Sequence, residues 1–325
     1  MSTLDVGSPD NVLHRDGAGR LNISSAWIWF LPLGASLLAA TAKGMIRDLS
    51  QQYLQALMVS LVMTVVLVLV EKALPPAGPH KRSPHIILNL QIGILLLFGV
   101  TSFGAFDGFL VSLLRRHLSV RQVDLSLHSA DTVAALVVTV LFSWLIYDFF
   151  YYWYHRSQHT FSVLWQLHKF HHLDEQVSVT TRFRAQLTDV LINSLLIGTS
   201  IALIFRLDPI ATAKYSTFIA LAGEFLADYK HLNIRLHLGW ASPLMVGPQT
   251  HRIHHSRLMQ HHNRNFGVYF MIWDILFGTY YHPSRAEFPP TGVDGESDVR
   301  SVHEVLTLPY RGWWAMFGDW RHRPT

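Results

Sequence analysis

Long uncharged stretches alternate with short polar ones along the first third of the chain. Three apolar runs without Asp, Glu, Lys or Arg cover residues 21–42, 49–70 and 83–106. A helix needs about 20 mainly apolar residues to cross the hydrocarbon core of a bilayer. Each of these runs therefore predicts a membrane-spanning helix.

Shorter apolar runs follow at residues 132–147, 190–205 and 209–227. We expect the first to be a fourth span, because the aromatic segment FFYYWY after it is typical of the membrane–water boundary. The other two are consistent with spans or with a hairpin that does not cross completely. Between them and the long runs, Leu110 to Arg121 carries three arginines among leucines, which is typical of either an interfacial helix or a solvated basic loop.

The pattern divides the chain into four parts. Residues 1–20 are polar and predict a flexible tail. Residues 21–130 hold the N-terminal transmembrane helices and the interfacial segment. Residues 131–283 are expected to form the catalytic domain, and residues 284–325 a C-terminal tail. The aromatic end of that tail is expected either to pack on the preceding domain or to lie against lipid headgroups.

Composition supports a membrane protein over two soluble domains. Half of the 325 residues are hydrophobic and only 15% are charged, against a usual charged share of about 25%. The net charge is +4, and the basic residues are scattered beside apolar runs, which favours a lipid surface over nucleic acid as a partner. The chain has no cysteine, which excludes disulfides, iron–sulfur clusters and Cys-ligated zinc.

Histidine is the residue type that carries candidate chemistry. The pattern HxxxH is followed by HxxHH and, well downstream, by a second HxxHH; its members are His155, His159, His168, His171, His172, His251, His254 and His255. Residues three or four apart share a helix face, so we expect three helices to point these rings into a common interior. Imidazole suits Fe, Zn, Cu and Ni. One zinc ion takes three or four protein ligands, so this number of rings predicts two ions.

At these residues the chain resembles the sterol desaturase and fatty acid hydroxylase superfamily of membrane di-metal oxygenases, over about residues 131–283. Also similar to the family are Asp148 seven residues before His155, the segment KHLN with His231 and Asn233, and the ending that starts at Asn265 in NFGVYFMIWDILFGTYYHP. The resemblance adds His231 to the metal ligands. Metal-bound imidazoles usually donate their other N–H to a supporting acceptor, and the candidates for this role are Asp148, Asn233 and Asn265, together with Glu224, Asp228 and Asp274.

The resemblance implies an all-α polytopic membrane protein with about four to six transmembrane or membrane-embedded helices and a cytosolic helical cap that carries a His-rich dimetal site. Two iron ions would use O₂ and externally supplied electrons to hydroxylate or desaturate a lipid such as a sterol or fatty acid. No dinucleotide-binding, P-loop or cytochrome b5-like motif is present, so a separate reductase, ferredoxin or cytochrome is expected. Four crossings would put the N-terminus and the site on one side, which the family places in the cytosol, at a bacterial inner membrane or the ER membrane.

One segment departs from the family pattern. Many members have an Arg-aromatic-His-Pro segment after the second cluster, whereas this chain has Arg184-Ala185-Gln186-Leu187. We expect a different substrate pocket or different support of the ligands, and not inactivation. Four further histidines do not fit the helical spacing and are expected to be surface or supporting residues; they are His237, His261, His262 and His282. His261 and His262, close behind His255, are the most open of these.

Other functions remain possible at this point. A His-ligated zinc hydrolase in the membrane is one, although no HExxH motif is present and the ligands exceed the need of one zinc. A metal-binding transporter is another, although its histidines are expected within the spans, and these lie beyond the ends of apolar runs. A catalytically inactive sensor of the same fold is a third, although no ligand position is missing.

Overall fold

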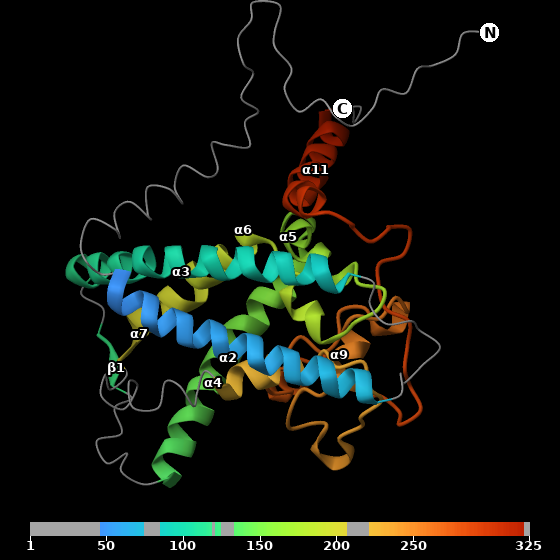
Figure 1. Ribbon diagram of the computed structural model, residues 1–325, viewed down its shortest axis with the longest axis horizontal. Helices are drawn as coiled ribbons and strands as arrows, with labels where there is room; N and C mark the ends of the chain where they lie inside the picture. The colour runs from blue at the N-terminus through green and yellow to red at the C-terminus, as the bar shows by residue number, and fades with distance from the viewer. Residues whose placement is uncertain (1–45, 75–84, 119–120, 125–132, 207–220, 322–325) are drawn as a thin grey trace, which may run out of the picture.

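The computed structural model describes residues 46–74, 85–118, 121–124, 133–206 and 221–321, and it is mostly helical (Figure 1). Three long helices dominate: α2 (Ile46–Ala73), α3 (Ile86–His117) and α4 (Val133–Thr160). Two strands of two residues each, β1 (Val123–Asp124) and β2 (Phe205–Arg206), pair in parallel. The prediction of a mainly helical protein is confirmed, with this short strand pair as an addition.

Shorter elements fill the rest of the described chain. They are α5 (Ser162–His172), η2 (Val179–Phe183), α6 (Leu187–Asn193), η3 (Ser194–Gly198), α7 (Thr199–Ile204), a helical segment at 221–229, η4 (Gly239–Ala241), α9 (Pro248–His254), η5 (Met259–His261), α10 (Ile272–Leu276) and α11 (Val302–Arg321). Apart from the 20-residue α11, the chain after α4 therefore consists of short helices joined by irregular segments.

Helix α2 turns its polar residues toward the protein. Ser60 donates a hydrogen bond to Glu224 at 2.6 Å, and Thr64 donates to Asp228 at 3.1 Å. Further along the same face, the Glu71 carboxylate accepts the backbone N–H of Val179 at 3.1 Å. Because 60, 64 and 71 recur at helical spacing, they form one polar stripe. This stripe attaches α2 to two segments that lie between His172 and His231 in the sequence.

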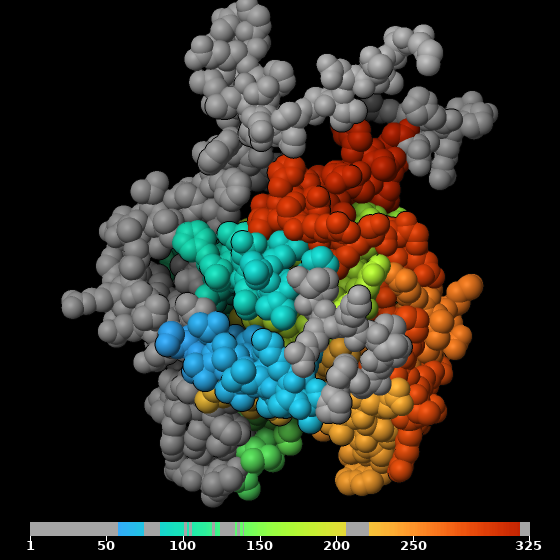
Figure 2. All heavy atoms as spheres, turned by 45° about the vertical axis from the view of Figure 1, so that its right-hand side comes forward, coloured from blue at the N-terminus to red at the C-terminus, as the bar shows by residue number. Residues whose placement is uncertain are grey.

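The outward faces of the long helices are apolar. Large exposed side chains include Leu61, Val62, Val65, Leu69, Ile87, Ile94, Phe98, Val137, Val138 and Phe142. Helices α2 and α3 lie side by side on one face of the molecule, with α11 next to α3 (Figures 1 and 2). Soluble monomers rarely expose apolar patches larger than a few hundred Å², so these faces are suited to contact with lipid.

The predicted apolar runs can be compared with these helices. Runs 49–70, 83–106 and 132–147 fall within or largely within α2, α3 and α4, and run 190–205 falls largely within Leu187–Ile204. Within the part of the chain that the structure describes, only Leu187–Ile204 passes by both length and composition as a candidate span, and Ile86–Val100 is a shorter apolar helix. Run 21–42 and most of 209–227 lie outside the described residues, so the number of crossings remains a prediction.

Two local expectations change. Residues 110–117 continue α3 and do not start a separate interfacial helix; Arg115 at its end donates to the backbone oxygen of Ala202 at 2.6 Å. The expected tail at 284–325 is folded as far as Arg321, because α11 packs on the preceding domain. Val299 and Val305 are buried in one core cluster with α3 and with Phe170 of α5. At the aromatic end, Trp313 packs on the domain and donates to the backbone oxygen of Val163 at 2.8 Å, whereas Trp314 and Phe317 are exposed.

Candidate metal centre

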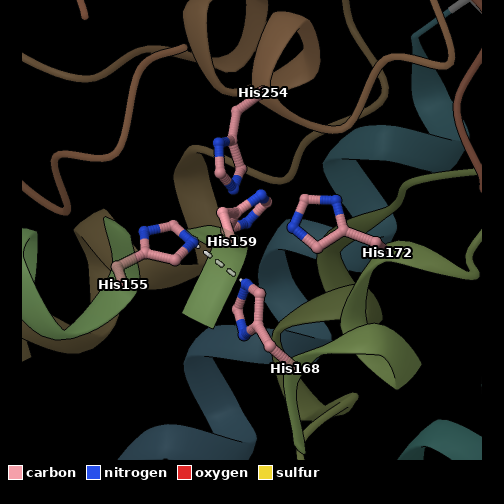
Figure 3. Close-up of side chains that lie close together, drawn as sticks. All are labelled: His155, His159, His168, His172 and His254. Atoms are coloured by element: carbon pink, nitrogen blue, oxygen red, sulfur yellow. Dashed lines mark hydrogen bonds between the residues drawn. The ribbon is translucent and has the colours of Figure 1, made fainter. Parts of the chain in front are cut away.

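The nine predicted histidines converge from four segments. Helix α4 carries His155 and His159 in its last turns, α5 carries three, α9 carries two with His255 directly after it, and His231 follows the helical segment 221–229. The structure divides them into two groups, in each of which one nitrogen per ring lies within 4.8 Å of all the others. The five-histidine group is His155, His159, His168, His172 and His254 (Figure 3), and the four-histidine group is His171, His231, His251 and His255.

The two groups are interleaved along α5 and along the region of α9. Helix α5 gives His168 and His172, one turn apart, to the five-histidine group and His171 to the other. In the second HxxHH the division is reversed. His251 and His255, one turn apart, belong to the four-histidine group, and His254 between them belongs to the five-histidine group. The groups are adjacent: the rings of His172 and His255 stack with centroids 4.5 Å apart.

In the five-histidine group, backbone carbonyls fix the ring orientations. Nδ1 of His155 lies 2.8 Å from the oxygen of Phe266, and Nδ1 of His254 lies 2.9 Å from the oxygen of Arg264. A ring that donates through Nδ1 leaves Nε2 with a free lone pair. This is the usual arrangement of metal-bound histidine. The buried Nε2 atoms of His159, His172 and His254 have no hydrogen-bond partner, and the rings point toward a common centre (Figure 3).

In the four-histidine group His231 repeats this arrangement, whereas the buried Nδ1 atoms of His251 and His255 have no hydrogen-bond partner. Nδ1 of His231 lies 2.8 Å from the oxygen of Ala227, and its Nε2 lies 3.0 Å from Nε2 of His251. Nε2 of His255 lies 3.2 Å from Nε2 of His251, and Nε2 of His171 lies 3.5 Å from that of His231. Several lone pairs that converge so closely repel one another, and a cation between them removes the repulsion. The residues therefore fit a metal ion at each group.

Burial keeps these rings neutral. Transfer out of water lowers the pKa of His254 to about 4. Burial, followed by the neighbouring imidazoles, lowers the pKa of His171, His172 and His255 well below its usual range. Neutral imidazole is the form that binds metals. Neither group contains a carboxylate, so its donor set consists only of ring nitrogens.

Aromatic side chains enclose the five-histidine group. The Phe266 ring lies 5.2 Å from that of His159, Trp165 lies 5.3 Å from the same ring, and Tyr151 lies 5.5 Å from His155. His159 and His171 are half-buried, while the other seven histidines are buried. The site is therefore shielded on most sides, and its open side lies near His159 and His171.

The segment from Asn265 to Thr279 holds one of these carbonyls in place. The Asp274 carboxylate accepts the backbone N–H of Phe266 and of Gly267, both at 2.8 Å, so it fixes the peptide whose carbonyl faces His155. A Cβ at Gly267 would lie 2.2 Å from the oxygen of Phe270, which only glycine avoids. The Asn-aromatic-Gly and Trp-Asp segments that resemble the family thus orient a ring through the backbone.

Asp148, expected to support the ligands, does not lie against a histidine ring. Its buried carboxylate accepts the backbone N–H groups of Val268 at 2.7 Å, Tyr269 at 3.3 Å and Phe270 at 2.9 Å. Seven residues before His155 place it on the same helix face but about 10 Å lower along the axis. Asp148 therefore holds the segment beyond Gly267 and acts on the site only indirectly.

Asn233 and Asn265 also bind the surrounding chain. The Asn233 side-chain oxygen accepts from Arg252 at 3.3 Å. The Asn265 amide donates to the backbone oxygens of Thr250 and Tyr281, both at 3.1 Å, and its φ of 59° lies in the left-handed region that Asn tolerates well. Both residues therefore connect α9 to neighbouring segments, and neither makes a hydrogen bond to a ring of the nine.

The other histidines lie outside both groups. His261 is buried between Ser256, at 2.8 Å, and Glu287, at 2.9 Å, whereas His262 is exposed. His237 and His282 lie beside each other, with ring centroids 5.2 Å apart. Sequence reasoning missed the ring-orienting carbonyls of Ala227, Arg264 and Phe266. No residue type signals them, because every residue carries a carbonyl.

Comparison with known proteins agrees with this arrangement. Residues 140–279 match the family model described as fatty acid hydroxylase. Alkylglycerol monooxygenase of Danio rerio is 29% identical over 171 residues, which are 51% of this chain and 36% of that protein. Ornithine lipid hydroxylase OlsE of Rhizobium tropici is 27% identical over 157 residues, which are 48% of this chain and 46% of that protein.

The matched segments thus cover less than half of each of these two relatives. No solved structure matches the chain. The family match spans the segment in which all nine histidines of the two groups lie. The histidine-bearing region of this chain, residues 140–279, belongs to the fatty acid hydroxylase family.

Proposed function

We propose that the chain is a membrane-bound di-iron oxygenase that hydroxylates a lipid. The observation that carries the proposal is the pair of adjacent groups, five and four histidines, whose ring nitrogens converge without a carboxylate. Bound iron would supply the activation of O₂ there. The chain itself holds the rings neutral and oriented, and its aromatic walls keep bulk water from the five-histidine group.

A lipid substrate is supported by two independent features. The names of the relatives refer to alkylglycerols and to ornithine lipid, both amphiphilic molecules. The outward faces of α2, α3 and α4 are apolar, which suits a protein that meets its substrate in the bilayer. Because both relatives are named as a monooxygenase or hydroxylase, we favour hydroxylation over desaturation. Electrons would come from a separate reductase, ferredoxin or cytochrome, at the cytosolic face of an inner or ER membrane.

Comparative lipidomics tests this proposal. Cells that express the chain should accumulate a lipid heavier by one oxygen, and cells that express His172→Ala should not, because that variant removes a ring from the five-histidine group. The exposed His262→Ala serves as the matched control and should behave as the wild type. A product that lacks two hydrogens would indicate desaturation. No altered lipid in any strain would contradict the oxygenase proposal.

Metal analysis separates the alternatives. The protein isolated with its native metals should contain about two irons per chain. Two zinc ions with no O₂ consumption would favour the hydrolase. Metal flux in proteoliposomes would favour the transporter, although the position of the rings at and beyond the helix ends, and not inside the apolar runs, argues against it.

A further inference from the structure

A cavity of about 300 Å³ lies between α3, α4 and the stretch α6–η3. Its walls include Phe103 of α3, Tyr147 of α4, and Val190, Leu191 and Gly198. A volume of this size is at the lower end of ligand pockets. Most of the side chains that line it are apolar or aromatic, and Asn193 and Ser194 are the polar members of the wall. The cavity therefore suits an apolar group.

This cavity lies on the same face of α4 as the five-histidine group. Tyr147, Tyr151 and His155 follow one another at one-turn spacing, and their ring centroids are 5.9 Å and 5.5 Å apart in succession. Eight residues of helix correspond to about 12 Å along the axis. The cavity and the metal centre thus lie at opposite ends of the row Tyr147, Tyr151 and His155 on α4, and the helix fixes the distance between them.

The far wall of the cavity is shaped by a π turn. Residues Ser194–Gly198 form η3, a single π turn between α6 and α7; such turns are rare and are frequent at functional sites. Gly198 contributes no side chain to this wall. A Cβ there would meet only Asp107 at 3.7 Å and Ser194 at 3.9 Å. A larger side chain at position 198 would fit the backbone and reduce the cavity.

We propose that this cavity receives the hydrocarbon end of the lipid substrate. The inference rests on the proposed function, and it adds that the protein selects lipids by the length of their hydrocarbon chain. If the chain end is seated beside Gly198, the fixed distance along α4 determines which carbon lies beside the five-histidine group. Gly198 and Phe103 would then be specificity-determining residues, because each sets the depth of the cavity.

Two variants change that depth in opposite directions. Gly198→Leu should shift the oxygenated lipids toward chains shorter by several carbons, and Phe103→Ala should shift them toward longer chains. The matched control is Gly108→Leu on α3, because a Cβ there would meet no atom within 4 Å, and it should leave the distribution unchanged. Retained activity with an unaltered chain-length distribution in both cavity variants would overturn the proposal.

A photolabelling experiment tests whether a lipid occupies the cavity without requiring catalytic turnover. The purified full chain in lipid nanodiscs is irradiated with a 16-carbon fatty acid that carries a diazirine at its methyl end, and the labelled residues are mapped by mass spectrometry. Label should appear on Phe103, Tyr147 or the stretch 190–198, and Gly198→Leu should reduce it at least several-fold while Gly108→Leu should not. Labelling elsewhere refutes the cavity assignment. Labelling at the cavity without any oxygenated lipid refutes the proposed function alone.

Discussion

A histidine ring can offer either of its two nitrogens, and in this chain the backbone decides which one. The oxygens of Phe266, Arg264 and Ala227 each face Nδ1 of one ring, so the free lone pair is on Nε2 in His155, His254 and His231. Support of this kind typically changes metal affinity 10–100-fold when it is lost. For these three rings, the geometry of the ligands depends on backbone carbonyls of a loop and of the helical segment 221–229.

Loss of a single ring tests the assignment of the four-histidine group. His171→Ala leaves three histidines there, so we expect bound metal to fall by at least half and activity to be lost. Metal per chain is measured by elemental analysis of the purified protein, with His262→Ala as the control at an exposed position. Full metal retention by His171→Ala would contradict the assignment.

At the scale of residues, the sequence predicts which histidines come together, but not how they divide into two groups. The three- and four-residue spacings correctly bring eight rings together, and the family resemblance adds His231. The division into five and four is not visible in the spacing, because it depends on how α5 and α9 are rotated about their axes. Asp148 was expected beside His155 since it shares its helix face, but axial distance, which a face argument ignores, separates them.

At the scale of elements, the buried guanidinium of Arg184 joins α5 to the C-terminal region. Arg184 is fully buried, donates to the Asp298 carboxylate and lies 4.0 Å from that of Asp174. It also donates to the backbone oxygen of Phe170 in α5 at 3.2 Å. Gln186, at the position of a histidine in many relatives of the superfamily, donates to the oxygen of Val305 in α11 at 2.7 Å. This departure from the family pattern serves to attach α11.

Removal of the Arg184 guanidinium is expected to lower the free energy of unfolding. Arg184→Ala leaves the carboxylates of Asp174 and Asp298 without their cation, and breaking a buried pair in this way costs about 3–5 kcal/mol. Thermal unfolding in detergent measures the loss. The control is Arg257→Ala, whose pair with Glu175 is largely exposed and contributes about 0–1 kcal/mol. Equal stability of the two variants would show that Arg184 does not connect these elements.

Over the whole molecule, the polarity of α2 is the reverse of that of a helix on a soluble protein. Its polar stripe faces inward, and Leu61, Val65 and Leu69 face outward. Within the described residues, the apolar runs 49–70, 83–106, 132–147 and 190–205 coincide largely with helices, because the length of an apolar run can be seen in the sequence alone. Packing of the C-terminal segment on the domain was one of the two expectations, but its buried partners, Leu88, Ile92 and Phe170, could not be predicted because they are distant in sequence.

The absence of cysteine allows a direct test of contact with lipid. Spin labels are placed one at a time by Leu69→Cys and Ile94→Cys, at outward apolar positions of α2 and α3, and by Ser297→Cys, at an exposed polar position. In nanodiscs the first two should collide often with O₂, which concentrates in lipid, and rarely with a water-soluble nickel chelate. The third should show the opposite. Ready access of the chelate to Leu69→Cys would contradict membrane contact for α2.

Because α5 and α9 each carry rings of both groups, the binding of the two proposed metal ions would be coupled. Each of these segments contributes to both groups, so an ion that enters one group restrains rings that border the other. The first ion then bears the entropic cost of ordering α5 and α9, and the second ion binds to segments that are already ordered. Uptake would in that case be all-or-none, and a cell short of iron would contain full and empty copies of the protein with few half-filled ones.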